Sequence, residues 1–241
     1  MRRASILVLL TAVLACVACP AVRATLPDDD TTEGVEVAPV LTDEEAAHLA
    51  LFEEPVLTPE QQAAVLAQYA NVDPGNAIPK ILRDRALVYY DANKPHIENP
   101  RFLTVIDFTS ASKLERFHII DMNTGKVQSL HSAHGSGSDP DNTGVAQKFS
   151  NTPQSKMSSL GFYKTAETYT GAHGLSLRLD GLSDTNSNVR ARAIVIHGAD
   201  YVEDIDVFAS EKFDVALPST QILASNSLLG KNEVNAGGGL R

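Results

Sequence analysis

The chain has 241 residues, of which 43% are hydrophobic, enough for one packed domain of ordinary size with extensions. Its formal net charge is -10, and it has no tryptophan and only 6% aromatic residues, so the expected core is largely aliphatic. This acidity argues against a general affinity for nucleic acid, which needs clustered Lys and Arg, and predicts repulsion from anionic membrane surfaces.

The first 24 residues have the features of an export signal. Arg2 and Arg3 precede an apolar run at residues 5–14, and small residues follow. The apolar run is too short to span a bilayer. We therefore expect an exported protein of the periplasm or cell envelope. The alternative is a buried N-terminal helix.

The two cysteines of the chain, Cys16 and Cys19, lie within this segment. Residues 13–16 resemble a lipoprotein signal, in which Cys16 would carry a lipid anchor to the membrane. Residues 22–24 would instead suit ordinary signal peptidase, and the sequence leaves both routes open. In either case no disulfide forms inside the folded domain.

A helical segment is predicted for residues 42–92, after an acidic linker at residues 25–41 that has the composition of a disordered chain. Thr42 and Glu45 form a capping box, and Thr58 precedes a proline at a second helix start. The expected helices span residues 42–52, 59–70 and 79–91.

The third of these helices should pack one face against a core. Its apolar residues recur at helical spacing and are predicted to lie on one side: Ile78, Ile81, Leu82, Ala86, Tyr89 and Tyr90. We interpret this face as ordinary core packing.

From about residue 101 the pattern changes to the two-residue period of β-strands. Apolar runs bounded by turn residues lie around 103–105, 117–119, 160–165, 175–179 and 192–198. Asn123, Thr124 and Gly125 indicate a hairpin turn, and the polar residues 139–157 indicate a long loop. The expected fold class is mainly β with N-terminal helices (α+β), with a β domain at residues 93–204 and a divergent tail at 205–241.

Seven stretches of this segment carry a resemblance to a known family. They are VIDF at 105–108, RFHIID at 116–121, AHG at 133–135, FSNTP at 149–153, SSLGFY at 158–163, SLRLDGL at 176–182 and AIVIHGADY at 193–201. Together they make residues 78–204 resemble the murein L,D-transpeptidase catalytic domain family.

The resemblance implies a mixed β domain and an activity that cross-links or trims peptidoglycan. In this family a cysteine thiolate attacks a carbonyl of a stem tetrapeptide, a histidine activates the thiol, and backbone amides stabilise the oxyanion. His197 and Gly198 match the Ile-His-Gly context of the family's base at a strand end. The alternative is a strand-end histidine whose partner has been lost. The resemblance implies no cofactor.

The sequence departs from the family at the nucleophile. The family's cysteine follows the base in a Gly-Cys step, but no cysteine occurs after Cys19, and the next glycine after Gly198 is Gly230. No downstream serine stands in a nucleophile-elbow context. The divergence begins near Ile205, so we expect a domain that is incomplete at its C-terminus and catalytically inactive.

Further candidates for substrate binding lie in the matched stretches. They are His134, Gly135, Ser158, Ser159, Tyr163 and Arg178. Arg178, with Arg190 or Arg192, could bind a stem-peptide carboxylate, although ordinary salt bridges are equally expected in an acidic protein. His131 and His134 are three apart in a predicted strand or at its end, which puts them on opposite faces, so we expect no metal site.

Three functions remain open at this point. The chain could be an active L,D-transpeptidase or L,D-carboxypeptidase with an unrecognised nucleophile. It could be a non-catalytic relative that binds peptidoglycan stem peptides or a protein partner through the inherited cleft. It could also be a truncated or frame-shifted family member, which the abrupt divergence near Ile205 favours. The oligomeric state stays open.

Overall fold

The computed structural model describes residues 39–198 and 222–225, which belong to one compact unit. Within these residues seven strands form one sheet, in the spatial order β3 (Val127–Leu130), β2 (Phe117–Asp121), β1 (Phe102–Ile106), β7 (Ile222–Ser225), β4 (Phe162–Gly171), β5 (Gly174–Gly181) and β6 (Val195–His197). The predicted signal segment with Cys16, and most of the predicted linker and tail, lie outside the described residues.

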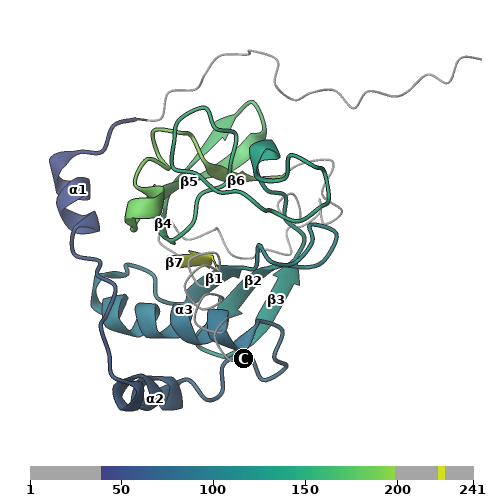
Figure 1. Cartoon of the computed structure of the whole chain (residues 1–241). Coiled ribbons are helices and arrows are strands. Elements are labelled where there is room, and N and C mark those ends of the chain that lie inside the picture. Colours follow the sequence, from purple (N-terminus) through teal and green to yellow (C-terminus); the bar gives the residue numbers. More distant parts are fainter. Residues whose placement is uncertain (1–38, 199–221, 226–241) are drawn as a thin grey trace, which may run out of the picture. The chain divides into compact units, whose positions relative to one another are not determined.

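Three helices precede the sheet, as the sequence predicts: α1 (Asp43–Leu49), α2 (Pro59–Gln68) and α3 (Lys80–Asn93). Both expected start signals are present, because Thr42 caps α1 in a reciprocal capping box with Glu45, and Thr58 does the same for α2 with Gln61. Figure 1 shows α3 lying against the sheet near β1, with α2 beyond it. The α+β class expected from the sequence is therefore confirmed.

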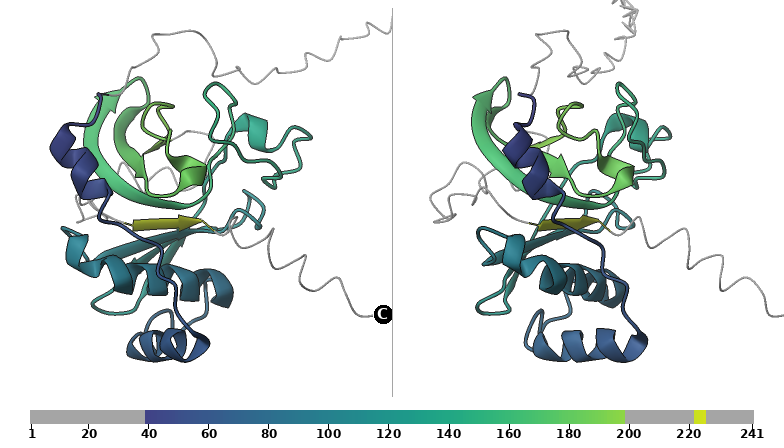
Figure 2. Two further views of the ribbon diagram at one scale, coloured as in Figure 1. Left: turned by 60° about the vertical axis from the view of Figure 1, so that its left-hand side comes forward. Right: turned by 90° about the vertical axis from the view of Figure 1, so that its left-hand side faces the viewer.

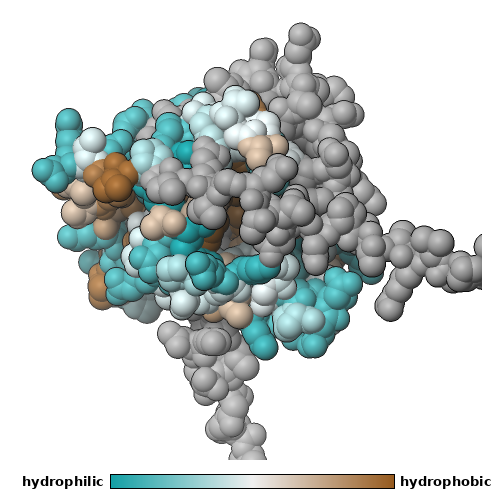
Figure 3. Space-filling view, turned by 90° about the horizontal axis from the view of Figure 1, so that it is seen from above, coloured by the Kyte–Doolittle hydropathy of each residue, from teal (hydrophilic) through white to brown (hydrophobic). Residues whose placement is uncertain are grey.

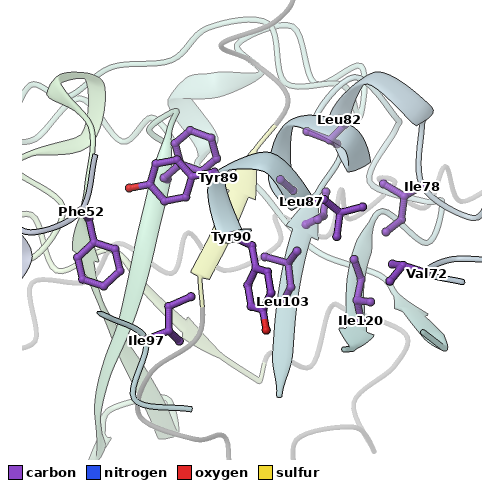
Figure 4. Close-up of a cluster of buried hydrophobic side chains, with 13 residues drawn as sticks. Phe52, Val72, Ile78, Leu82, Leu87, Tyr89, Tyr90, Ile97, Leu103 and Ile120 are labelled. Carbon is purple, nitrogen blue, oxygen red and sulfur yellow. The ribbon is translucent and has the colours of Figure 1, made fainter. Parts of the chain in front are cut away.

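The main core lies between α3 and β1. Leu82 and Tyr90 of the helix share one buried cluster with Leu103 and Ile120 of the sheet, and Tyr89 stacks in the same cluster on Phe162 of β4 (Figure 4). Ile81 was expected on the same face but is 57% exposed. Each residue advances about 100° around a helix, so Ile81 lies beyond the edge of the buried stripe set by its neighbour Leu82.

The first three strands form an antiparallel meander. β1 pairs with β2, and β2 pairs with β3 through the turn expected at residues 123–125. Gly125 has a φ of +72°, and a Cβ there would lie 2.2 Å from the carbonyl oxygen of Asn71, so the turn requires glycine for both conformation and space.

The other half of the sheet is a long hairpin extended by a short edge strand. β4 and β5 pair antiparallel with an irregularity between Thr165 and Thr168, and Figure 2 shows the strong curvature of β4. β6 covers only three residues, although strand was expected over 192–198. Residues before Val195 form a turn instead, in which Ala193 has a φ of +51°.

β7 joins the two halves of the sheet. It pairs parallel with β1 and antiparallel with β4, so a four-residue segment of the predicted divergent tail occupies the middle of the sheet. This strand was not predicted from the sequence.

A long irregular segment connects β3 to β4, as predicted for residues 139–157, and includes the short 3-10 helix η2 (Ser136–Ser138). His131 follows β3 directly, and His134 lies within the irregular segment. Of the two expected positions, within a strand or at its end, His131 has the second, whereas His134 lies beyond the strand, so the opposite-face argument does not apply to the pair. We call residues 131–159 the β3–β4 loop.

Candidate functional site

His197 is the last residue of β6 and pairs in register with Ser176 of β5. Its Nδ1 lies 2.7 Å from the carbonyl oxygen of Gly198. A carbonyl can only accept, so Nδ1 carries the proton and Nε2 holds the lone pair in the neutral ring. This is the tautomer in which Nε2 can act as a proton acceptor.

The imidazole of His197 also stacks on a second histidine. The ring of His173, in the turn between β4 and β5, lies 4.4 Å from it between centroids, with 17° between the planes. Two nearly parallel rings cannot both direct an in-plane nitrogen at one ion, so this pair does not have metal-ligand geometry.

The arginine proposed to bind a substrate carboxylate is engaged within the protein. Arg178 on β5 lies 3.3 Å from Glu167 and stacks over the ring of Tyr169 at 3.9 Å. Arg190 bridges Asp180 and Glu167 with two edges of its guanidinium, and these bonds raise its pKa. The ordinary salt-bridge alternative thus describes the contacts that Arg178 and Arg190 make in the structure.

His134 lies between two charged groups in the β3–β4 loop. Arg116 donates a hydrogen bond of 2.8 Å to Nδ1 of His134, and Nε2 lies 3.7 Å from a carboxylate oxygen of Asp139. Because guanidinium can only donate, Nδ1 is unprotonated and the ring is neutral, with its proton on Nε2. Burial lowers the pKa of His134, the charge of Arg116 lowers it further, and Asp139 opposes the shift.

Arg116 is fully buried just before β2. It donates to the carbonyl oxygens of Ser110 and Ser132 as well as to His134. Burial lowers its pKa to about 10, which the charge of Asp107 partly offsets. The guanidinium therefore remains charged at neutral pH, held almost entirely by neutral acceptors.

The remaining candidates hold the two sides of the β3–β4 loop together. The amide of Gly135 donates to the hydroxyl of Ser158 at 3.0 Å, and a Cβ on Gly135 would lie 2.3 Å from the carbonyl oxygen of Lys156. The Ser159 hydroxyl donates to the carbonyl of Ser150, while the Tyr163 hydroxyl donates to the carbonyl of Ser159. In the structure, the hydroxyls of Ser158 and Ser159 are thus engaged in hydrogen bonds within the loop.

Arg192 fastens the same loop to the turn before β6. Its guanidinium donates to the carbonyl oxygens of Ser150 and Met157 and to the hydroxyls of Ser155 and Ser159. Burial lowers its pKa. Arg192 therefore links the loop to the segment that leads into His197.

The predicted residues thus fall into two sets. His134, Gly135, Ser158, Ser159 and Tyr163 belong to the network of the β3–β4 loop, whereas His197 and Arg178 belong to the β5–β6 pair. Figure 3 shows the molecule from above the view of Figure 1. On this face the described residues are mostly hydrophilic. Neither His173 nor the roles of Arg116 and Asp139 were anticipated. Its position at the start of the matched stretch 116–121 was the available signal for Arg116.

Within the described residues, no helix is long and apolar enough to cross a membrane, and no three His, Cys, Asp or Glu side chains gather in a way that could hold a metal.

Comparison with known proteins identifies the family. A model of the L,D-transpeptidase catalytic domain matches residues 76–213, which include α3 and all the strands from β1 to β6. No curated protein and no solved structure matches the chain. Because the match covers more than half of the sequence, the chain belongs to the L,D-transpeptidase catalytic domain family.

Proposed function

We propose that this chain is a cell-envelope protein that binds peptidoglycan stem peptides and does not carry out thiol-dependent transfer. One observation carries the proposal: residues 76–213 keep a histidine in the Ile-His-Gly context but contain no cysteine. A base that has no thiol to activate cannot form the acyl-enzyme. Family membership supports peptidoglycan as the class of ligand.

The geometry of His197 supports a loss of the nucleophile rather than of the base. Its ring is held by the carbonyl of Gly198 on one edge and by the ring of His173 on one face. These contacts favour the tautomer that a general base needs. Contacts with a stem peptide do not need a sulfur atom, so binding can persist without chemistry.

The catalytic part of the proposal is tested by purifying the chain from Thr25 onward and incubating it with a disaccharide-tetrapeptide. We expect no release of D-alanine by mass spectrometry and no covalent adduct with a carbapenem, since both need the nucleophile. Release that disappears in a His197→Ala variant would refute this part and would point to one of the serines from Ser210 onward.

The binding part is tested by titrating the same protein with the disaccharide-tetrapeptide in a calorimeter. We expect saturable binding, with a disaccharide that lacks the peptide as the matched control. Saturable binding of both ligands would assign recognition to the sugar, and absence of any saturable heat would refute a stem-peptide function.

The envelope location is a separate part of the proposal, supported by the signal-like residues 1–24. Labelling cells with a radioactive fatty acid distinguishes the two routes. Label that is lost in Cys16→Ser and kept in the matched variant Cys19→Ser would identify a lipoprotein. Unlabelled protein released with the periplasmic fraction would identify ordinary cleavage, and retention in the cytoplasm would contradict export.

A further inference from the structure

The β3–β4 loop is held by a partly buried side chain that can take up a proton. The neutral ring of His134 accepts a hydrogen bond from the guanidinium of Arg116 at Nδ1, and its Nε2 faces Asp139. Both ring nitrogens are thus turned toward charged neighbours. The arrangement cannot serve as a general base, because Nδ1 already accepts a bond and Nε2 carries the proton.

This histidine sits where many contacts of the loop converge. Arg116 fastens the start of the loop through the carbonyl of Ser132, and Asp139 accepts from the amide of Gly144 and the hydroxyl of Thr143. The carbonyl of Ser138, next to Asp139, accepts from two further loop amides, and its hydroxyl accepts from the amide of Ser158. Displacing His134 would therefore disturb both sides of the loop.

We propose that Arg116, His134 and Asp139 form an acid-sensitive latch that keeps the β3–β4 loop closed while His134 is neutral. Closed here means the hydrogen-bonded arrangement of the loop described above, and open means the arrangement in which those loop contacts are lost. A proton added to Nδ1 removes the acceptor of the Arg116 bond and places two cations 2.8 Å apart. Arg116 stays charged over the pH range in which histidine takes up a proton. The bond breaks, and of the contacts between Arg116 and the loop only those to Ser132 remain.

The charged groups around the ring determine the direction of this response. Arg116 opposes protonation of His134 and Asp139 favours it, while burial adds to the effect of Arg116 and holds the pKa of His134 below its ordinary value. A histidine that is neutral in the closed loop and solvated in the open one binds a proton on opening. Opening is then favoured as the pH falls below about 6.5, the ordinary histidine value.

The size of the pH-dependent shift in the loop equilibrium follows from the uptake of one proton on opening. Between pH 7.5 and 5.5 the equilibrium between closed and open loop should shift by up to about tenfold toward the open state. The inference concerns the stability of the loop and does not depend on the proposed ligand or on catalysis.

The test is amide hydrogen exchange by NMR on the full-length protein at pH 7.5 and 5.5, corrected for the intrinsic pH dependence of exchange. We expect the protection factors of the loop amides of Gln147 and Ser158 to fall at the lower pH, by up to about tenfold. Amides of α3 should keep theirs. Unchanged protection of the loop amides would overturn the proposal.

Two variants test whether His134 causes the pH response of the loop. In His134→Asn the amide oxygen can still accept from Arg116 but cannot be protonated, so the pH response should disappear. The matched control is His131→Asn, in the same loop, where the response should remain. A response that persists in His134→Asn, or that disappears only in His131→Asn, contradicts the latch.

A second measurement keeps the proposal testable if the His134 variant does not fold. Nitrogen chemical shifts of the His134 ring in the wild-type protein report its tautomer and its protonation. We expect a proton on Nε2 at pH 7.5, and protonation of Nδ1 in step with loop exchange. A ring that is doubly protonated at pH 7.5, or one that is protonated while the loop stays closed, would overturn the proposal.

Discussion

Two neighbouring residues at the start of α3 provide a sharp test of the core. Leu82 is 2% exposed and packs in the cluster between α3 and β1, whereas Ile81 is 57% exposed. The two side chains have the same number of carbon atoms and share one turn of helix. Replacing each by alanine therefore separates the effect of burial from the effect of residue type.

We expect Leu82→Ala to lower the free energy of unfolding by about 2–5 kcal/mol, because it removes buried methyl groups and leaves a cavity. Ile81→Ala should change it by less than about 0.5 kcal/mol, since the side chain lies in solvent and alanine has the higher helix propensity. Urea denaturation followed by circular dichroism measures both, with a fall in midpoint of about 1–2 M for Leu82→Ala. Equal losses in the two variants would refute the assignment of the buried face.

Three further predictions concern a turn, a buried amide and an acid-dependent contact. Gly125→Ala should lower the thermal midpoint by more than Gly174→Ala, because both glycines have positive φ but only Gly125 lacks space for a Cβ; equal shifts would contradict this. Asn93→Ala should cost about 1–3 kcal/mol in urea unfolding, since it removes two half-buried hydrogen bonds between α3 and Glu53, after α1, and a buried one to the carbonyl of Tyr89 within α3; an unchanged midpoint would argue against those bonds. Hydrogen bonds from Thr143 and then Gly144 lower the pKa of Asp139, so its stabilisation is present above about pH 3.8 and is lost as the pH falls below that value. The difference in urea midpoint between wild type and Asp139→Asn should accordingly shrink from pH 5 to pH 3. A constant difference would contradict a lowered pKa of Asp139.

The features that depend on neighbouring residues could be predicted from the sequence. The capping boxes at Thr42 and Thr58 each need only residues three positions apart, and both are present. The turn at Gly125 and the strands on either side of it follow from short patterns as well. The family was recognised from matched stretches, and the domain match confirms it.

The tertiary structure decided which partners the functional candidates have. His134 was proposed from a matched stretch as a substrate-binding residue, and the structure shows that its ring contacts Arg116, 18 residues earlier, and Asp139. His197 was placed at a strand end from its context, yet its stacking on His173 depends on the hairpin that brings β5 beside β6. No local pattern reports such contacts, because they arise from the packing of segments distant in sequence.

The chain by itself determined its helix starts, its β region and its family, since these depend on local hydrogen bonding, periodicity and matched motifs. Tertiary structure alone decided that Ile81 lies in solvent beside the buried Leu82, and that residues 222–225 enter the middle of the sheet between β1 and β4. The helix pattern specifies a face only to within about one residue, and strand pairing is settled by which backbone edges meet. Both outcomes depend on what surface the rest of the fold presents.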